Sequence, residues 1–334
     1  MASPVLDTVG TVVIGRNEGN RLVRCLESVF LQCSSVVYVD SGSTDGSSER
    51  AEELGALVTS LDLSIPFSAG RARNVGFASL LSSNPDIGFV QFVDGDCILS
   101  RDWLKHALGI FKDKAEVSIV CGRRREMHPG DSIYNMMCDL EWDTPVGYTG
   151  SCGGDFLVTV ESFRTLGGFN DSVIAGEEPE MCYRLTKSGG KVYRTDHDMT
   201  LHDAQMHRFA QWWKRTLRSG HAYMQCLYIH RLSPNWNDAK SVGSILFWGA
   251  LLPLLFLLSL SSQYFGFANL IVILYIYLIV KFYVYVRKTK RSTRFESLIY
   301  SLYTTLGKVP QVLGVLKFIY STLASKKPKI IEYK

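Results

Sequence analysis

Two long apolar segments constrain the fold of this chain more than any other feature of its sequence. The first runs from Val242 to Leu260 without a charge, and the second runs from Tyr264 to Val286. Its one charge, Lys281, lies near the end, where a long side chain reaches the membrane surface. About twenty apolar residues in a helix span a bilayer core. Because only the three residues SSQ separate the segments, we expect a helical hairpin that crosses a membrane twice or enters it and returns.

Basic residues flank this hairpin on both sides. "WWKRTLR" precedes it, "RKTKRSTR" follows it, and the short linker carries no positive charge, so both flanks are predicted to be cytoplasmic. The segment after the hairpin is less apolar, is interrupted by Lys308 and Pro310, and ends in lysines. This pattern favours a pair of helices lying on anionic lipid, and the alternative is a third membrane crossing. The predicted division is a cytoplasmic domain over residues 1–235, a hairpin over 236–290 and an amphipathic basic tail over 291–334.

Charge and cysteine content exclude other classes of protein. A net charge of +4, with no basic stripe in the first two hundred positions, is too small to indicate nucleic acid as a partner. The eight cysteines form no CxxC pair and no zinc-binding spacing, which fits free thiols in a reducing cytosol. The N-terminal "MASPVLDTVG" lacks the pattern of a signal sequence, so the first domain is expected to stay in the cytoplasm.

The first half of the chain alternates short β-branched runs with longer helical patterns. The expected strands are "TVVIG", "SVVYVD", "ALVTS", "IGFVQFVD" and "EVSIVCG". This order predicts an α/β domain with a mostly parallel sheet covered by helices. In the helix after Gly19, the side chains expected to face the sheet are Leu22, Val23, Leu26, Val29 and Phe30. The region from Pro145 to His230 is rich in glycine and is expected to be more irregular, with binding loops.

Two expected strands end in acidic residues. Asp94 and Asp96 follow the apolar run "IGFVQFV", and Asp40 ends "SVVYVD". Ligands of open parallel sheets bind beyond the carboxyl ends of the strands, and two alternate carboxylates suit a hard divalent cation. The other interpretation is a pair of ordinary solvated turns, with Asp45 capping the second.

The ordered motifs carry a resemblance to a known family. "VVIGRNEGNRLVRCLESV", "VDSGSTDGS", "AGRARNVGFA", "FVDGDC", "GGFND" and "GEEPEMCYRLTKSGG" cover roughly Val9 to His221. This set resembles the cytoplasmic domain of inverting glycosyltransferase family two, which has the GT-A fold, a Rossmann-like nucleotide-binding architecture. The resemblance implies a nucleotide-diphosphate sugar as donor and Mg²⁺ or Mn²⁺ as cofactor.

The resemblance also assigns roles to residues of the donor pocket. Asp40, and less directly Asp45, would contact the nucleotide base, although Ser41 stands where many relatives carry a second aspartate. In the DxD pair Asp96 would hold the metal, and His202 and Asp94 are candidates for further ligands. The favoured role of Asp94 is a contact with the ribose or support of the turn. The residues assigned to the nucleotide sugar are Ile14, Arg16, Asn17, Glu18, Asp40, Ser41, Arg73, Asp94, Gly95, Asp96, Gly154 and Asp155.

"GEEPE" stands where the family has its catalytic acidic motif. This implies that Glu178 is the general base and that Glu177 orients the acceptor or the base. The alternative is an acidic helix N-terminus favoured by the helix dipole. Downstream, His202, His207, Arg208 and Trp212 would meet the diphosphate or close over it.

Two further segments keep two interpretations each. Processive synthases carry QxxRW, whereas this chain has Gln205 and Arg208 but Phe209 in place of the tryptophan, which weakens a processive interpretation. Trp212 and Trp213 fit either the closing segment or an aromatic belt at the membrane. The run "GRRREMHP" faces either an anionic acceptor or solvent.

The expected function is metal-dependent, inverting transfer of one sugar to a hydroxyl of a lipid-linked, polyprenyl-diphosphate saccharide at the inner membrane, in assembly of a cell-surface glycan. The expected partners are the nucleotide sugar, the acceptor, the bilayer and a second copy of the chain. The alternatives are a transferase acting on polyprenyl phosphate itself, a processive synthase, and a nucleotide-binding membrane scaffold without catalysis.

Overall fold

The computed structural model describes residues 8–261 and 264–324. The N-terminal "MASPVLD", most of the SSQ linker and the lysine-rich end therefore lie outside the described residues. The strands are β1 (Val9–Gly15), β2 (Ser35–Asp40), β3 (Leu57–Ser60), β4 (Phe89–Asp94), β5 (Cys97–Leu99), β6 (Val117–Glu126), β7 (Gly147–Thr149), β8 (Phe156–Thr159) and β9 (Lys191–His202).

The first seven helices belong to the part of the chain with the strands. They are α1 (Asn20–Phe30), α2 (Ser47–Glu53), α3 (Ala69–Ser83), α4 (Trp103–Asp113), α5 (Ile133–Trp142), α6 (Val160–Leu166) and α7 (Glu177–Lys187). The later helices are α8 (Phe209–Ile229), α9 (Trp236–Leu246), α10 (Leu252–Ser261), α11 (Phe265–Thr289), α12 (Arg294–Leu306) and α13 (Lys308–Leu323), with a short π-helical stretch η2 (Phe247–Leu251) between α9 and α10.

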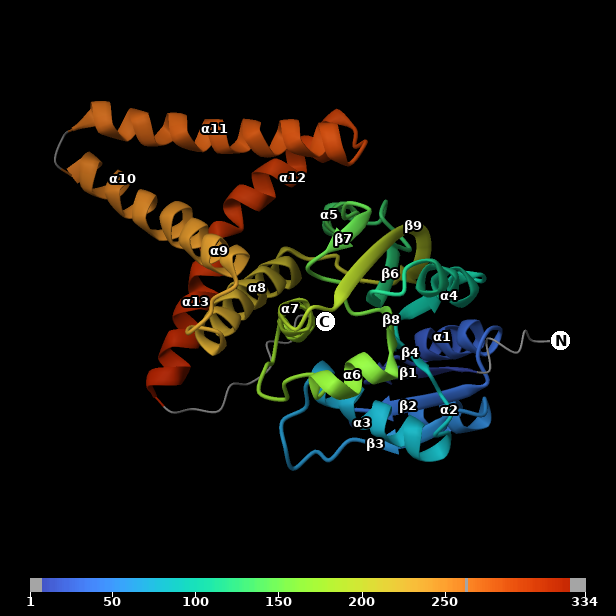
Figure 1. The fold of residues 1–334 in the computed structure, drawn as a ribbon. Helices are drawn as coiled ribbons and strands as arrows, with labels where there is room; N and C mark the ends of the chain where they lie inside the picture. The colour runs from blue at the N-terminus through green and yellow to red at the C-terminus, as the bar shows by residue number, and fades with distance from the viewer. Residues whose placement is uncertain (1–7, 262–263, 325–334) are drawn as a thin grey trace. The chain divides into compact units, whose positions relative to one another are not determined.

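The strands form one mixed sheet in the order β3-β2-β1-β4-β8-β6-β9-β5, and β7 pairs with β9 outside this path. The pairs β1–β2, β1–β4 and β2–β3 are parallel, as predicted, and so is the pair β6–β9. Strand β8 is antiparallel to both β4 and β6, and β5 and β7 are antiparallel to β9. Helices flank the sheet (Figure 1), so the predicted α/β class with a mostly parallel sheet is confirmed.

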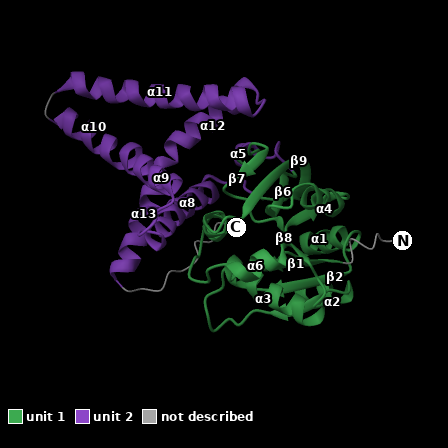
Figure 2. Ribbon diagram, in the orientation of Figure 1, with its two compact units in different colours: residues 1–127, 141–204 green, residues 128–140, 205–334 purple. Residues whose placement is uncertain are grey.

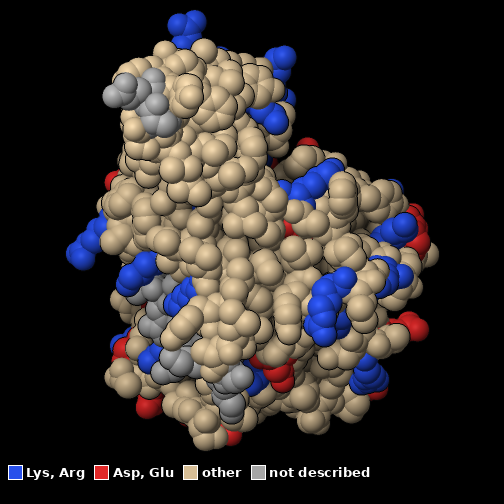
Figure 3. All heavy atoms as spheres, turned by 90° about the vertical axis from the view of Figure 1, so that its left-hand side faces the viewer, with Lys and Arg blue, Asp and Glu red and all other residues tan. Residues whose placement is uncertain are grey.

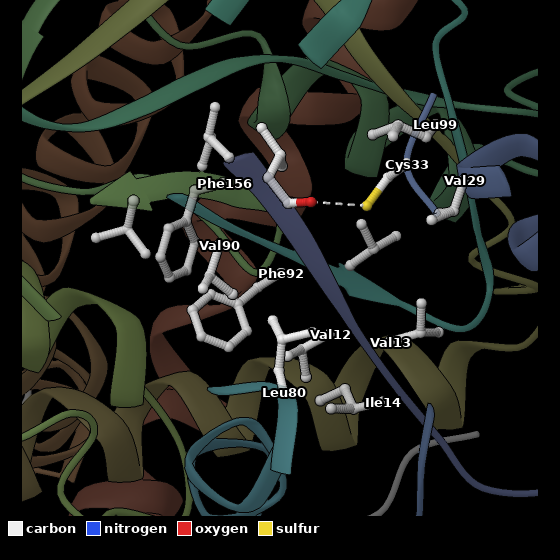
Figure 4. Packing of buried hydrophobic residues seen from close by; sticks show 14 of the residues in the cluster. Val12, Val13, Ile14, Val29, Cys33, Leu80, Val90, Phe92, Leu99 and Phe156 are labelled. Atoms are coloured by element: carbon white, nitrogen blue, oxygen red, sulfur yellow. Dashed lines mark hydrogen bonds between the residues drawn. The ribbon is translucent and has the colours of Figure 1, made fainter. Parts of the chain in front are cut away.

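The core lies around β1 and β4, the central strands of the parallel part. Figure 4 shows Val12 and Val13 of β1 among side chains of β4, β8 and the neighbouring helices. Helix α3 approaches β1 closely because residue 76 is glycine, where a Cβ atom would overlap Val12. At the start of β1, the Cys33 thiol donates a hydrogen bond to the carbonyl oxygen of Val9 at 3.2 Å.

Helix α1 confirms the predicted buried face in part. Leu22, Leu26 and Val29 are fully buried, but Val23 and Phe30 keep part of their surface exposed. Cys25 and Ser28 are buried in their place. The apolar face is therefore rotated slightly toward the small residues of the helix, which a pattern of large apolar residues alone does not indicate.

Residues 145–230 are more regular than predicted. They contain β7, β8, the twelve-residue strand β9, helices α6 and α7, and the 21-residue helix α8. The sequence pattern did not indicate β9, because its buried and exposed positions do not alternate regularly over "KVYRTDHDMTLH". Its pairing with β6 contains register shifts, which explains this irregular pattern.

The described chain divides into two compact units (Figure 2). One holds residues up to 127 together with 141–204, and the other holds 128–140 together with the residues from 205 onward. Each unit is described by itself below. The division into a cytoplasmic domain, a hairpin and a tail at 235 and 290 was drawn from composition and stays a prediction.

The second unit contains the two apolar helices. Two helical runs, Trp236–Ser261 and Phe265–Thr289, are long and apolar enough to cross a membrane, each with a mean hydropathy of 2.1. The first begins six residues before the predicted Val242, because α9 includes the polar turn that leads into the apolar segment. In the face shown in Figure 3, the surface over these helices is almost free of charged side chains. Their exposed residues include Leu254, Leu257, Ile273 and Ile276.

The tail beyond the hairpin forms two helices. The Thr293 hydroxyl oxygen caps α12 by accepting the backbone N–H of Glu296, and the Glu296 carboxylate accepts the backbone N–H of Thr293. Helix α13 packs against α8 at Gly220 and Gly314, where a Cβ atom would overlap the backbone of the other helix. Among the described residues, neither α12 nor α13 is long and apolar enough to count as a membrane span. Whether this helix pair lies on lipid stays a prediction.

Candidate active site

The sheet register brings the predicted acidic residues to one edge of the first unit. Asp40 is paired with Gly15 and Asp94 with Ile14, so both aspartates lie at the carboxyl end of β1. Antiparallel β8 begins directly after Asp155, which places this third carboxylate at the same edge. The strand-end position follows from the alternating strands and helices that the sequence shows.

The first cluster at this edge, here named the arginine corner, consists of Arg73, Asp94, Arg124, Asp155 and Glu177. Arg73 comes from α3, is 2% exposed, and bridges Asp94 at 2.6 Å and Glu177 at 3.2 Å. Arg124 of β6 contacts the other oxygen of Asp94 at 3.0 Å and approaches Asp155 at 3.3 Å. Burial alone would raise the pKa of Asp94, but the two guanidinium groups outweigh it and hold the pKa well below its usual range.

Two further contacts fix the geometry of the arginine corner. Asp155 is fully buried, accepts the backbone N–H of Asp94 at 3.0 Å, and accepts the hydroxyl of Thr200 at 2.8 Å. Gly154 lies so close to the cluster that a Cβ atom there would come within 2.8 Å of Asp94 Oδ2. Gly154 and Asp155, which were predicted to contact the nucleotide sugar, thus hold Asp94 in position.

The second cluster, here named the histidine corner, consists of Asp96, Glu126 and His202. His202 Nε2 lies 3.4 Å from Asp96 Oδ2, and His202 Nδ1 lies 3.8 Å from Glu126 Oε2. Burial, and then the charge of Arg124, lower the pKa of His202, which favours the neutral imidazole. All three side chains are buried.

The histidine corner fits a divalent metal ion. Ligand atoms of Asp96, Cys97 and His202 lie within 4.8 Å of one another. Carboxylate and neutral imidazole suit Mn²⁺, and a ligating histidine usually places its other nitrogen beside a carboxylate. His202 Nδ1 is buried without a hydrogen-bond partner and faces Glu126, which fits that arrangement. Asp94, predicted as a further ligand, is engaged by the two arginines instead.

The residues predicted at the nucleotide base are tied into their own loops. Asp40 accepts the backbone N–H groups of Gly42 and Ser43 and the hydroxyl of Tyr38. Asp45 accepts from Ser47 at the start of α2, as the turn interpretation predicts. These two carboxylates therefore hold the loop after β2 in shape.

The loop after β1 lies against the loop after β2. Asn17 has a positive φ of 56° and its side chain accepts the backbone N–H of Thr44 at 2.7 Å. Arg16 stacks over Phe67, with 5.0 Å from the guanidinium carbon to the ring centroid, and Glu18 pairs with Arg21. The structure thus brings Arg16, Asn17, Glu18 and the buried Ser41 to one end of the sheet with Ile14 and Gly95.

Glu178 has a different environment from Glu177, its neighbour on α7. Its carboxylate is 7% exposed, accepts the backbone N–H of Cys152, and accepts the Cys182 thiol at 3.3 Å. Burial raises the pKa of Glu178, and the hydrogen bonds offset this only in part. A raised pKa suits a group that must take a proton near neutral pH.

Of the predicted closing residues, His202 belongs to the first unit, whereas His207, Arg208 and Trp212 belong to the second. The backbone N–H groups of His207 and Arg208 donate to the Gln211 side chain at the start of α8. Trp212 is buried, with its ring centroid 4.9 Å from that of Tyr303 in α12. A role of these residues over the diphosphate stays a prediction.

Sequence reasoning missed two residues of the site, Arg124 and Glu126. Both lie in the first five residues of "GRRREMHP", which form the second half of strand β6, while the last three residues follow the strand. Alternate positions of that strand face the site edge, and Glu126 is opposite His202 in the register. The apolar run "EVSIVCG" directly before the arginines was the available signal, because it indicates a buried strand that continues.

Comparison with known families decides the class of this fold. Residues 11–150 match the family described as glycosyl transferase family 2, and residues 136–208 match the one described as the N-terminal domain of galactosyltransferase. Residues 11–150 therefore form a domain of the glycosyl transferase family 2 type. Its sheet and flanking helices are of the GT-A type, which confirms the predicted resemblance and fold.

Curated relatives of this chain include two enzymes of sugar transfer. The pre-mycofactocin glycosyltransferase of Mycobacterium tuberculosis is 29% identical over 58% of this chain and 42% of its own length. The O-antigen chain rhamnosyltransferase WbaN of Salmonella anatum is 26% identical over 55% of this chain and 61% of its own. The chain thus covers less than two thirds of either relative.

A solved structure that covers nearly all of this chain is among those that resemble it. It is the mannosyltransferase PcManGT from Pyrobaculum calidifontis in complex with GDP-Man and Mn²⁺, with a TM-score of 0.60 and 15% identity. The match covers 96% of this chain and 90% of that one. At this identity the likeness shows the fold alone.

Proposed function

We propose that the chain is a membrane-anchored, inverting glycosyltransferase that moves one sugar from a nucleotide-diphosphate donor to a hydroxyl of a lipid-linked saccharide. The observation that carries this proposal is the histidine corner at the carboxyl edge of a family 2 domain, with Glu178 in the same unit. The two sugar-transferring relatives and the fold shared with a GDP-Man-bound mannosyltransferase support it.

The residues divide the work of the proposed reaction. Glu178, whose raised pKa favours proton uptake, takes the proton of the acceptor hydroxyl as its oxygen attacks the anomeric carbon from the face opposite the nucleotide. Asp96 and His202 would hold a divalent ion, Mg²⁺ or Mn²⁺, which stabilises negative charge on the departing diphosphate. Glu126 fixes the orientation of the His202 ring. Arg73 and Arg124 keep Asp94 ionised at the rim of this site.

The apolar hairpin supports a membrane-bound acceptor. A polyprenyl-diphosphate saccharide moves in the plane of the membrane. Anchoring the enzyme in the same membrane therefore raises the effective concentration of the acceptor at the enzyme. Because basic residues flank both ends of the helical pair, we place the catalytic unit on the cytoplasmic face of the inner membrane. The O-antigen relative supports a place in the assembly of a cell-surface glycan.

The test uses the full chain in lipid nanodiscs with Mn²⁺ and radiolabelled nucleotide sugars. Three acceptors are offered separately: a polyprenyl-diphosphate saccharide, polyprenyl phosphate, and a soluble saccharide. We expect label to pass to the first acceptor alone, with inverted anomeric configuration. Transfer to polyprenyl phosphate instead, or retained configuration, would contradict the proposal.

A further inference from the structure

A third group of side chains in the first unit has no part in metal binding at the histidine corner. Cys152 Sγ lies 3.5 Å from Cys182 Sγ, and Cys182 Sγ lies 3.3 Å from Glu178 Oε1. Ligand atoms of all three residues lie within 4.8 Å of one another, and all three side chains are buried. We name Cys152, Glu178 and Cys182 the thiol cluster.

Two elements hold the thiol cluster in place. Glu178 and Cys182 are four residues apart on α7, so their side chains lie on one face of the helix, one turn apart. Cys152 comes from the loop between β7 and β8, and its backbone N–H donates to Glu178 Oε1. The same carboxylate oxygen therefore fixes both the loop and the helix, and the three ligand atoms converge without a rearrangement of the backbone.

The distances match a tetrahedral thiolate site. With zinc ligand lengths, two sulfurs of a tetrahedron are about 3.8 Å apart and a sulfur and an oxygen about 3.5 Å. The observed distances of 3.5 Å and 3.3 Å are close to these edges. We infer that Cys152, Cys182 and Glu178 form a binding site for a thiophilic divalent ion of the Zn²⁺ class, separate from the Mn²⁺-type histidine corner.

The donor types distinguish the two sites. Thiolate sulfur selects Zn²⁺ and its soft relatives over Mg²⁺ and Mn²⁺, whereas the histidine corner offers carboxylate and imidazole. In the ion-free protein both thiols are protonated: burial raises the pKa of Cys152 well above its usual value. The pKa of Cys182 is raised to about 11, because burial and the charge of Glu178 outweigh the hydrogen bond from Cys152. Binding therefore releases two thiol protons to the solvent, and it weakens as the pH falls.

Occupancy of the thiol cluster has a consequence for transfer, which rests on the proposed role of Glu178. A Zn²⁺ ion on one oxygen of Glu178 lowers the pKa of that carboxylate, because the positive charge favours its ionised form, so the carboxylate takes the proton of the acceptor hydroxyl less readily. The ion therefore inhibits sugar transfer without displacing the nucleotide or Mn²⁺. The binding itself does not depend on the proposed activity.

The test measures binding and inhibition separately, on the reduced full chain in detergent. Co²⁺ serves as a spectroscopic probe, because thiolate ligands give an intense near-ultraviolet absorption, and Zn²⁺ affinity is measured by competition with a chelator. We expect one ion with thiolate absorption per chain, release of about two protons, and at least tenfold weaker Zn²⁺ binding in Cys182→Ser and in Cys152→Ser. Cys33→Ser is the matched control, because Cys33 is also buried but contacts Val9 at the start of β1 and is no member of the thiol cluster. It should bind like the wild type.

Several results would overturn the inference. They are the absence of thiolate absorption, Zn²⁺ affinity unchanged in both cysteine variants, or loss of the ion in Asp96→Asn, which would place it at the histidine corner. If the cysteine variants fail to fold, X-ray absorption of the Zn²⁺-loaded wild type decides between two sulfur ligands and none. Zn²⁺ that binds at the thiol cluster but leaves transfer unchanged would refute the inhibition alone. A chain without any transfer activity would refute the proposed function and leave the binding result intact.

Discussion

The arginine corner and the histidine corner each contain one aspartate of the same short motif, yet they differ in chemistry. Asp94 and Asp96 are separated by one glycine, yet Asp94 lies between two guanidinium groups and Asp96 faces His202. In the first corner the protein itself supplies the positive charge. In the second, two carboxylates face a histidine whose pKa is lowered, which leaves room for the charge of a metal ion. A shared motif therefore does not give its two acidic residues a shared role.

The largest effect is expected at the two neighbouring glutamates of α7. Glu178→Gln should lower kcat by roughly 10²–10⁴-fold, because it removes the proposed general base. Glu177→Gln should lower kcat less, because it removes an ion pair with Arg73 and leaves Glu178 in place. Steady-state transfer assays on both variants, with the exposed Glu161→Gln as control, decide this. A larger loss in Glu177→Gln would move the base into the arginine corner.

A second effect concerns the stability of the arginine corner. Asp94→Asn should destabilise the fold by about 3 kcal/mol, because it leaves two buried guanidinium groups without their shared carboxylate. Thermal denaturation followed by circular dichroism should show a lower melting temperature. The exposed Asp86→Asn should melt like the wild type. Equal melting of Asp94→Asn would mean that Arg73 and Arg124 do not depend on Asp94.

A smaller effect, on metal binding, is expected at Glu126, which lies beside Nδ1 of His202 in the histidine corner. Glu126→Gln should weaken Mn²⁺ binding by about 10–100-fold, the usual cost of removing the partner of a ligating histidine. Calorimetric titration with Mn²⁺ in the presence of a nucleoside diphosphate measures this. The exposed Asp198→Asn, on neighbouring β9, is the control. Unchanged affinity in Glu126→Gln would remove Glu126 from the metal site.

The smallest effect is a displacement of the pH profile. The proposed base acts only when it is unprotonated, so activity is lost as the pH falls through the pKa of Glu178. Because burial raises that pKa, the acid limb of kcat/KM should lie above about 4.3, the ordinary value for glutamate. If the acid limb lies at or below the ordinary pKa of glutamate, the base is not Glu178. The base would then be a carboxylate of the arginine corner, which guanidinium groups keep ionised.

The parallel part of the fold could be predicted from the sequence, because each of its strands and helices shows a local pattern. Strands β1, β2, β3 and β4 read as short β-branched runs, and α1 and α3 as periodic helices. Strands β8 and β9 were missed because they are stabilised by pairing with residues far away in the chain, and in β9 register shifts also disturb the alternation. The first residues of the site followed from strand ends, a local property.

The division of the site into two corners could not be predicted in the same way. That Arg124 reaches Asp94 depends on the register between β6 and β8, and that Glu126 faces His202 depends on the register between β6 and β9. Neither register is encoded in a short window of sequence. Similarly, the position of Cys152 beside Cys182 depends on a loop that meets α7 only in the folded chain.

The measurement that tests the central claim most directly is nucleotide binding with and without metal. Melting temperatures of the full chain would be recorded with a panel of nucleoside diphosphates, in Mn²⁺ and in EDTA, for the wild type and Asp96→Asn. We expect at least one nucleotide to raise the melting temperature of the wild type in Mn²⁺ and not in EDTA, and Asp96→Asn to lose this response. A nucleotide response that is equal in EDTA, or that survives Asp96→Asn, would contradict a metal site at the histidine corner.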